Sequence, residues 1–129
     1  MKIAVVLARV LLGLLFFVFG LNTLHSFRPV PPMPPSDATT FATLLMTSHY
    51  MTFVGVLMTI AGLLLLIGRF VPLALVILGP ILVNILSFHF FLMHGGAGMG
   101  IGATVLELFL IWAYRLSFRG LFDALPERA

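Results

Sequence analysis

The chain has 129 residues, of which 61% are hydrophobic and 9% are charged, with a formal net charge of +3. A soluble domain carries about a quarter charged residues, so this composition excludes an ordinary soluble globule. It also excludes a disordered chain, because there is ample apolar surface to bury. Cysteine is absent, which excludes disulfide frameworks, thiol nucleophiles and iron–sulfur clusters. Lys and Arg are scattered singly between apolar runs, which argues against nucleic acid as a partner.

Four apolar runs predict an all-α integral membrane protein. They cover about residues 3–24, 50–67, 72–93 and 98–116, and each is close to the roughly 20 residues that cross a ~30 Å hydrocarbon layer. The first run is longer than the apolar region of a typical signal peptide, so we interpret it as a retained helix. Residues 1–129 then form a single transmembrane domain, a four-helix bundle whose helices run up, down, up and down.

The distribution of basic residues predicts the orientation. An even number of spans places both termini on one side, together with Lys2, Arg9, Arg69, Arg115, Arg119 and Arg128, and leaves only Arg28 on the other. Cytoplasmic loops of membrane proteins are enriched in Lys and Arg. We therefore expect a multi-pass protein of the plasma (bacterial inner) membrane, with both termini in the cytoplasm.

The connections between the runs differ in character. Residues 27–49 are predicted to form an external loop, and the prolines at its start favour extended polyproline II geometry. A stiff loop and a docking strand for a partner are both compatible with these prolines. Ser36 or Asp37 is a candidate N-cap for a short segment through Phe41–Met46 along the outer surface. The short link 68–71 predicts that the second and third helices are antiparallel neighbours.

Small residues indicate where the helices approach one another, because helices in lipid associate by close packing. Pairs of glycines four or seven residues apart occur in three of the four runs, and they are Gly13 and Gly20, Gly55 and Gly62, and Gly98 and Gly102. We predict that these six glycines lie at helix contacts. Pro80 is predicted to kink the third helix and to free a carbonyl near Val76.

Glu107 is the only carboxylate inside a predicted span, and Arg9 lies at a compatible depth in the first helix. Intramembrane charges are costly unless they are paired, and they are functional candidates by default. We therefore predict an intramembrane ion pair between Arg9 and Glu107. The pair either fixes the order of the helices or belongs to a proton or quinone site.

Six further polar side chains are candidate contacts for a quinone or a metal ion: Asn22, His25, His49, Asn84, His89 and His94. All four histidines fall at the outer end of the predicted bundle, where imidazole can hydrogen-bond a quinone carbonyl or ligate a metal. A belt of half-solvated histidines is the alternative, and an interhelical hydrogen bond is the alternative for Asn84. No metal ligand set is assigned, because no HxxxH or HxxE pattern occurs. No Ser-His-Asp set or paired carboxylates are visible, so catalytic residues are unknown.

Several segments resemble the DoxX-like family of small four-span membrane proteins. The first span resembles that family's opening R-x-x-x-G-x-x-F-x-x-x-G pattern, in the residues from Arg9 through Gly13 to Gly20. The end of the second span, from Gly62 to Arg69, and the stretches from Pro80 to His89 and from Glu107 to Arg115 resemble later parts of the family. Related members often carry an acidic residue near the position of Met58.

The resemblance implies quinone-linked electron transfer, with quinone as the possible cofactor. The first hypothesis is a small accessory subunit, not catalytic on its own, of a larger respiratory or photosynthetic electron-transport complex. The second is a membrane subunit of a DoxX-type quinone-reducing oxidoreductase that acts on a sulfur compound. The third is a lipid or small-molecule carrier. The expected partners are the lipid bilayer and, under the first hypothesis, other membrane subunits.

Overall fold

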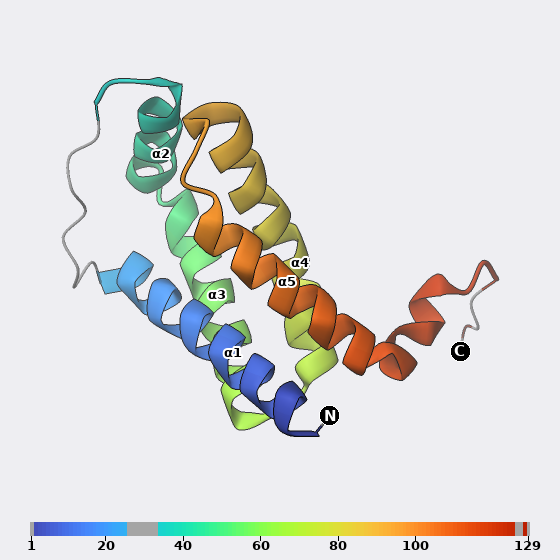
Figure 1. Ribbon diagram of the computed structural model, residues 1–129. Helices are drawn as coiled ribbons and strands as arrows, with labels where there is room; N and C mark the ends of the chain where they lie inside the picture. Colours follow the sequence, from blue (N-terminus) through green and yellow to red (C-terminus); the bar gives the residue numbers. More distant parts are fainter. Residues whose placement is uncertain (1, 26–33, 126–127, 129) are drawn as a thin grey trace.

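The computed structural model describes residues 2–25, 34–125 and 128, apart from the side chain of His25 (Figure 1). These residues contain helices and no strand, so the all-α prediction is confirmed for this part of the chain. The elements are α1 (Lys2–His25), α2 (Asp37–Thr47), α3 (Tyr50–Ile67), α4 (Val71–Ser87), the π-helix η1 (Phe88–Met93), α5 (Gly98–Ala113) and the 3-10 helix η2 (Arg115–Phe122).

Three helical stretches are long and apolar enough to cross a membrane: α1, α3, and α4 continued by η1. The fourth, α5, has 16 residues, about 24 Å at 1.5 Å per residue. It reaches the length of a span only together with η2, and η2 is bent from it by 84°. The fourth predicted run, 98–116, therefore ends as a straight helix at Ala113.

The end of α5 is set by the residues that follow it. Tyr114 leaves the helical region, with φ −101° and ψ 20°. Arg115 folds back and donates from Nη1 to the carbonyl of Trp112 at 2.9 Å, with its guanidinium carbon 4.8 Å from the centre of the Trp112 ring. A cation near a helix C-terminus satisfies carbonyls that have no partner within the helix. Phe118 is buried in the core, and this burial holds η2 at its angle.

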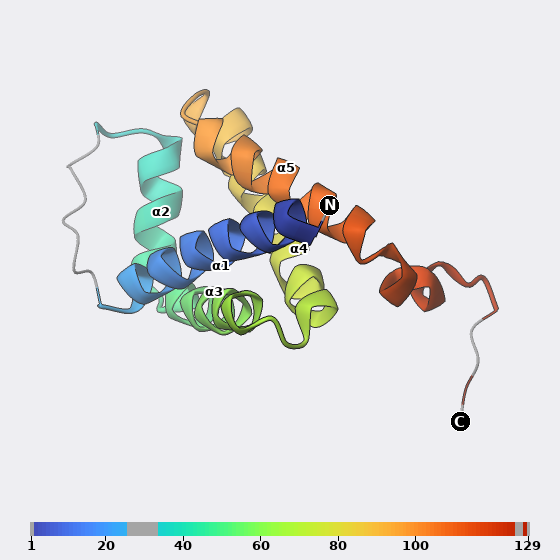
Figure 2. The same cartoon turned by 60° about the horizontal axis from the view of Figure 1, so that its bottom comes forward.

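The long helices run in alternating directions, and each packs against two others. α1 contacts α3 and α5, and α4 also contacts α3 and α5, as the two views show (Figures 1 and 2). At the end remote from the N-terminus, α2 packs against α3 and η1, with the Phe41 and Phe88 rings 5.9 Å apart. Ser36, one of the two predicted caps, accepts from the backbone N–H of Thr39.

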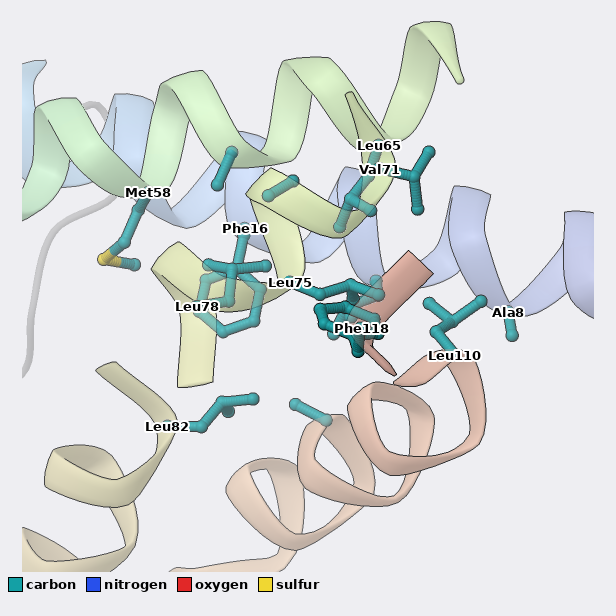
Figure 3. Close-up of a cluster of buried hydrophobic side chains, with 14 residues drawn as sticks. Ala8, Phe16, Met58, Leu65, Val71, Leu75, Leu78, Leu82, Leu110 and Phe118 are labelled. Carbon is teal, nitrogen blue, oxygen red and sulfur yellow. The ribbon is translucent and has the colours of Figure 1, made fainter. Parts of the chain in front are cut away.

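The core is a cluster of apolar side chains at the centre of the four long helices (Figure 3). Its largest fully buried members are Leu12, Leu65, Leu75, Leu78 and Leu110. Large apolar side chains also cover the outward faces of all four long helices. An apolar exterior of this extent is typical of a surface that meets lipid, because soluble proteins rarely expose large contiguous apolar patches.

Glycines bring α1 and α3 into the closest contact between any two helices. A Cβ at Gly62 would lie 2.4 Å from the backbone nitrogen of Phe17, and one at Gly20 would lie 2.4 Å from Oγ1 of Thr59. Distances this short do not occur between real atoms, so a side chain at either position would push the helices apart. Gly13 and Gly55 lie at the same interface.

The prediction was wrong for the glycines of α5. A Cβ at Gly98 or Gly102 would have nothing within 4 Å, whereas one at Gly100 would lie 3.2 Å from Ile85. The buried stripe of α5 is formed by Gly100, Ala103, Glu107 and Leu110. Gly98 and Gly102 lie outside that stripe, because four residues advance the helix by slightly more than one turn and both remain on the outer side.

Candidate functional site

A cavity of about 400 Å³ lies among the four long helices, in the half of the molecule nearest α2. Its wall is almost entirely apolar and consists of Leu15, Phe16, Phe19, Thr23, Met51, Met58, Leu82, Ile85, His89, Gly96, Met99, Gly100 and Ala103. Ligand pockets in proteins are commonly about 300–1,000 Å³, with apolar walls and a few polar groups that fix orientation. The cavity has the size and the lining of a site for one small apolar molecule.

Of the five predicted polar contacts whose side chains the structure describes, only His89 lines this cavity. It is carried by η1, and π-helical turns are rare and frequently occur at functional sites. Nδ1 of His89 lies 2.8 Å from the carbonyl oxygen of Ile85. A carbonyl only accepts, so Nδ1 donates, and in a neutral ring Nε2 is then an acceptor. The imidazole ring is nearly perpendicular to the ring of Phe88, at an interplanar angle of 88° and with ring centres 5.3 Å apart.

The structure does not gather the other predicted polar contacts around His89. Asn84 is exposed and donates from Nδ2 to the carbonyl of Pro80 at 3.0 Å. His49 and His94 are exposed at helix ends, where their φ angles of 64° and 57° belong to the left-handed region. Asn22 is half-buried on α1 and is absent from the cavity wall.

The last histidine of the predicted group, His25, ends α1, and its side chain lies outside the described residues. Among the described side chains, no three of the His, Asp and Glu type are grouped so that they could hold a metal ion. The outer histidines therefore do not form a cluster within this part of the chain. The reason is local: two of them occupy turn positions between helices, where the backbone directs the side chain outward.

Arg9 does not pair with Glu107, and this prediction was wrong. Its Nη1 donates to the backbone carbonyls of Leu65 and Leu66 near the end of α3. The last four carbonyls of a helix have no partner within it, and a cation there also interacts favourably with the helix dipole. The guanidinium fits because Gly68 leaves the space open: a Cβ there would lie 2.6 Å from Nη1, and the φ of 75° also favours glycine.

Glu107 is buried without a partner. Its side chain is 3% exposed, and neither carboxylate oxygen has a hydrogen-bond partner in the described residues. It faces α4, where a Cβ at Gly79 would lie 3.5 Å from Oε2. On α5 it follows Ala103 of the cavity wall by one turn, a rise of about 6 Å. The carboxylate therefore lies just beyond the floor of the cavity.

Three methionines in the cavity wall were missed as site residues from the sequence. They are Met51 and Met58 of α3 and Met99 of α5. In a sequence, single methionines within apolar runs look like ordinary residues of a core or of a lipid-facing surface. Methionine is unbranched and polarisable, so it adapts to the shape of a bound molecule. The signal available in the sequence was the small pair Gly100 and Ala103, which leaves room opposite them.

The side chains around the cavity are suited to binding a ligand rather than to catalysing a reaction. One imidazole nitrogen is available as an acceptor in this cavity. Thr23, the one other polar side chain among the described residues of the wall, donates to the carbonyl of Phe19 in its own helix at 2.8 Å. An occupant that fits is an apolar molecule of ring size with a single hydrogen-bonding group at one end. A hydroxyl donor directed at Nε2 satisfies both partners.

Comparison with known proteins identifies one relative that covers nearly all of the chain. A Bacillus subtilis (strain 168) protein described as "Uncharacterized protein YwoB" is 34% identical over 125 residues, which is 92% of this chain and 81% of the relative. No family model matches the chain. No solved structure matches it either.

Proposed function

The chain belongs to the family of the Bacillus subtilis protein YwoB, and we propose that this member is a four-span protein of the bacterial inner membrane that binds a quinone-type ligand. Its fold is then a four-helix bundle that crosses the membrane up, down, up and down, with α5 as a short fourth span that ends at the turn into η2. The cavity with His89 in its wall is the observation that carries the ligand proposal.

The charge distribution supports an orientation with both termini in the cytoplasm. The end of the molecule that holds the N-terminus, the α3–α4 link and η2 is basic. Lys2, Arg69, Arg115 and Arg119 lie there, and Arg9 reaches the end of α3 at the same end. At the opposite end, the charged residue of α2 is Asp37. Arg28, the single basic residue predicted on the outer side, lies outside the described residues. Cytoplasmic sides of membrane proteins carry the excess of Lys and Arg.

The ligand class follows from the chemistry of the chamber. A quinol carries hydroxyl donors on a flat apolar ring, and its hydroxyl can donate to Nε2 of His89. The remaining ring contacts only apolar or small side chains such as Phe16, Met58 and Ala103. The proposed physiological role is that of a small DoxX-like accessory subunit, which holds the quinol form of a quinone for a larger electron-transport complex.

Binding of a short-chain quinol to the protein in lipid nanodiscs tests the ligand proposal. Replacing His89 by Leu keeps the volume and removes the acceptor, and a hydrogen bond lost from a buried partner costs roughly 1–3 kcal/mol. We therefore expect His89→Leu to weaken binding about tenfold or more. His94→Leu is the matched control, because His94 is exposed at the same end. Equal affinities for both variants, or no binding by the unaltered chain, contradict the proposal.

Copurification tests the role as an accessory subunit. Mild detergent extraction from native membranes is expected to recover larger redox subunits in stoichiometric amounts together with this chain. Recovery of the chain as a lone oligomer that still carries a bound apolar molecule contradicts the accessory role and favours a carrier.

A further inference from the structure

Outside the cavity, η2 is a surface with an unusual combination of side chains. Phe118 is 5% exposed and inserts into the core beside Leu75 and Leu110 (Figure 3). Its neighbours Leu116 and Phe122 are 75% and 82% exposed. In a 3-10 helix, residues three apart lie on one ridge. Leu116, Arg119 and Phe122 therefore form one exposed ridge that is apolar at both ends and cationic in the middle.

The direction of η2 gives this ridge a place in the membrane. η2 is bent by 84° from α5 and extends away from the other helices in both views (Figures 1 and 2). This step rests on the four-span placement proposed above: if α5 crosses the membrane, a segment at that angle runs nearly parallel to the membrane surface. Amphipathic segments in that orientation bury apolar side chains at the headgroup–acyl boundary, while long cationic side chains extend to the headgroups.

Two arginines of η2 have the chemistry to bind a phosphate there. Arg115 is exposed, and its hydrogen bond to the carbonyl of Trp112 leaves further guanidinium N–H groups to donate. Arg119 is exposed on the apolar ridge, one helical turn and one residue further along. Guanidinium groups bind phosphate oxygens bidentately. Asp123, which follows η2, is the one acidic residue in the stretch 115–125.

We propose that η2 lies in the membrane interface and that Arg115 and Arg119 bind the headgroup phosphate of an anionic phospholipid. Leu116 and Phe122 then contact the acyl chains, which accounts for their exposure in the isolated chain. Phe118 fixes the segment to the core from the other side. The occupant is an anionic lipid because the end of the molecule that carries η2 is cationic and the ridge is apolar.

Trp112, the single tryptophan of the chain, provides the test. It is half-exposed beside Arg115, so lipids with brominated acyl chains that bind at η2 quench its fluorescence. The experiment compares brominated phosphatidylglycerol with brominated phosphatidylcholine in vesicles that contain both lipids in equal amounts. One basic residue near an anionic surface contributes about a fivefold preference, so quenching should show phosphatidylglycerol enriched about fivefold or more.

Variants separate this site from a general effect of charge. Arg115→Gln/Arg119→Gln is expected to reduce the enrichment to nearly one. Arg69→Gln, which removes a charge from the α3–α4 link at the same end, is expected to retain it. Unchanged enrichment in the double variant, or an equal loss in Arg69→Gln, overturns the proposal.

The quenching pattern also distinguishes a failure of the lipid-site proposal from a failure of the four-span placement. Quenching by neither lipid means that Trp112 does not meet acyl chains, and the four-span placement fails. Equal quenching by both lipids leaves that placement intact and refutes only the anionic-lipid site.

Discussion

The carboxylate of Glu107 is buried in the tertiary structure without a hydrogen-bond partner among the described residues. A buried polar group without a hydrogen bond costs free energy, and a carboxylate costs more than a neutral group. Arg9, the cation that the sequence places at a similar depth in the bundle, instead donates to the carbonyls of α3. Natural proteins retain such costs at functional sites. The position of Glu107 just beyond the cavity floor makes it the first residue to test for a role beyond packing.

Replacing Glu107 by Met is expected to stabilise the protein. Methionine has a similar shape and no polar group to satisfy, so the free energy of unfolding should rise by about 1–3 kcal/mol. Thermal unfolding in detergent, followed by far-UV circular dichroism, measures the change. Leu106→Met, a substitution at the half-buried neighbouring position, is the control. A decrease in stability at position 107 would show that the carboxylate has a stabilising partner, such as a bound cation.

At the scale of the element, the contact between α1 and α3 depends on the absence of side chains. Gly62 and Gly20 allow the two backbones to approach until a Cβ would overlap with the opposite helix. Dispersion forces in lipid reward this proximity, because no hydrophobic effect drives helices together there. The same contact places Gly68 beside Arg9, so the packing of the two helices and the capping of α3 are coupled.

Two glycine-to-alanine substitutions test this dependence with the same chemical change. Gly62→Ala should destabilise the protein by about 1–3 kcal/mol, the usual cost of overpacking. Gly102→Ala meets open space and should be neutral or stabilising by up to about 1 kcal/mol, because alanine favours helix. Thermal unfolding compares the two variants. Equal effects at both positions would mean that the α1–α3 contact is not as close as described.

At the scale of the whole molecule, charge is separated along the helices. The end with η2 and the α3–α4 link is cationic, whereas α2 at the opposite end carries Asp37. The segments at the two ends also differ: η2 combines arginines with apolar side chains, while α2 combines threonines with apolar ones. This asymmetry favours one orientation in a membrane, by the excess of basic residues on the cytoplasmic side.

Single cysteines in this naturally cysteine-free chain test the orientation. Ser48→Cys and Ser117→Cys are conservative changes at exposed positions at the two ends. A membrane-impermeant maleimide added to intact cells is expected to label position 48 and to leave position 117 unlabelled until the cells are opened. The opposite pattern would place both termini outside, and labelling of both positions would contradict a four-span topology.

The sequence by itself determined the all-α class and the approximate extents of the apolar helices. The reason is that twenty apolar residues in succession have few stable alternatives to a helix in a membrane. Gly68 and Pro72 are local signals for the end of α3 and the beginning of α4, and they do not depend on the rest of the molecule. The glycines of the first two runs were also readable, because their spacing places them on one helical face. Ser36 is a comparable local signal, since an N-cap depends only on its own first turn.

Only the tertiary structure decided which polar side chains meet. Arg9 had two possible partners at similar depth, a carboxylate on α5 and the free carbonyls of α3, and the close α1–α3 contact favoured the carbonyls. The bend after Ala113 depends on the burial of Phe118 among residues distant in sequence. Asn84 and His89 lie on different sides of the continuous stretch α4–η1, and packing against the neighbouring helices decides that the side with His89 faces the cavity.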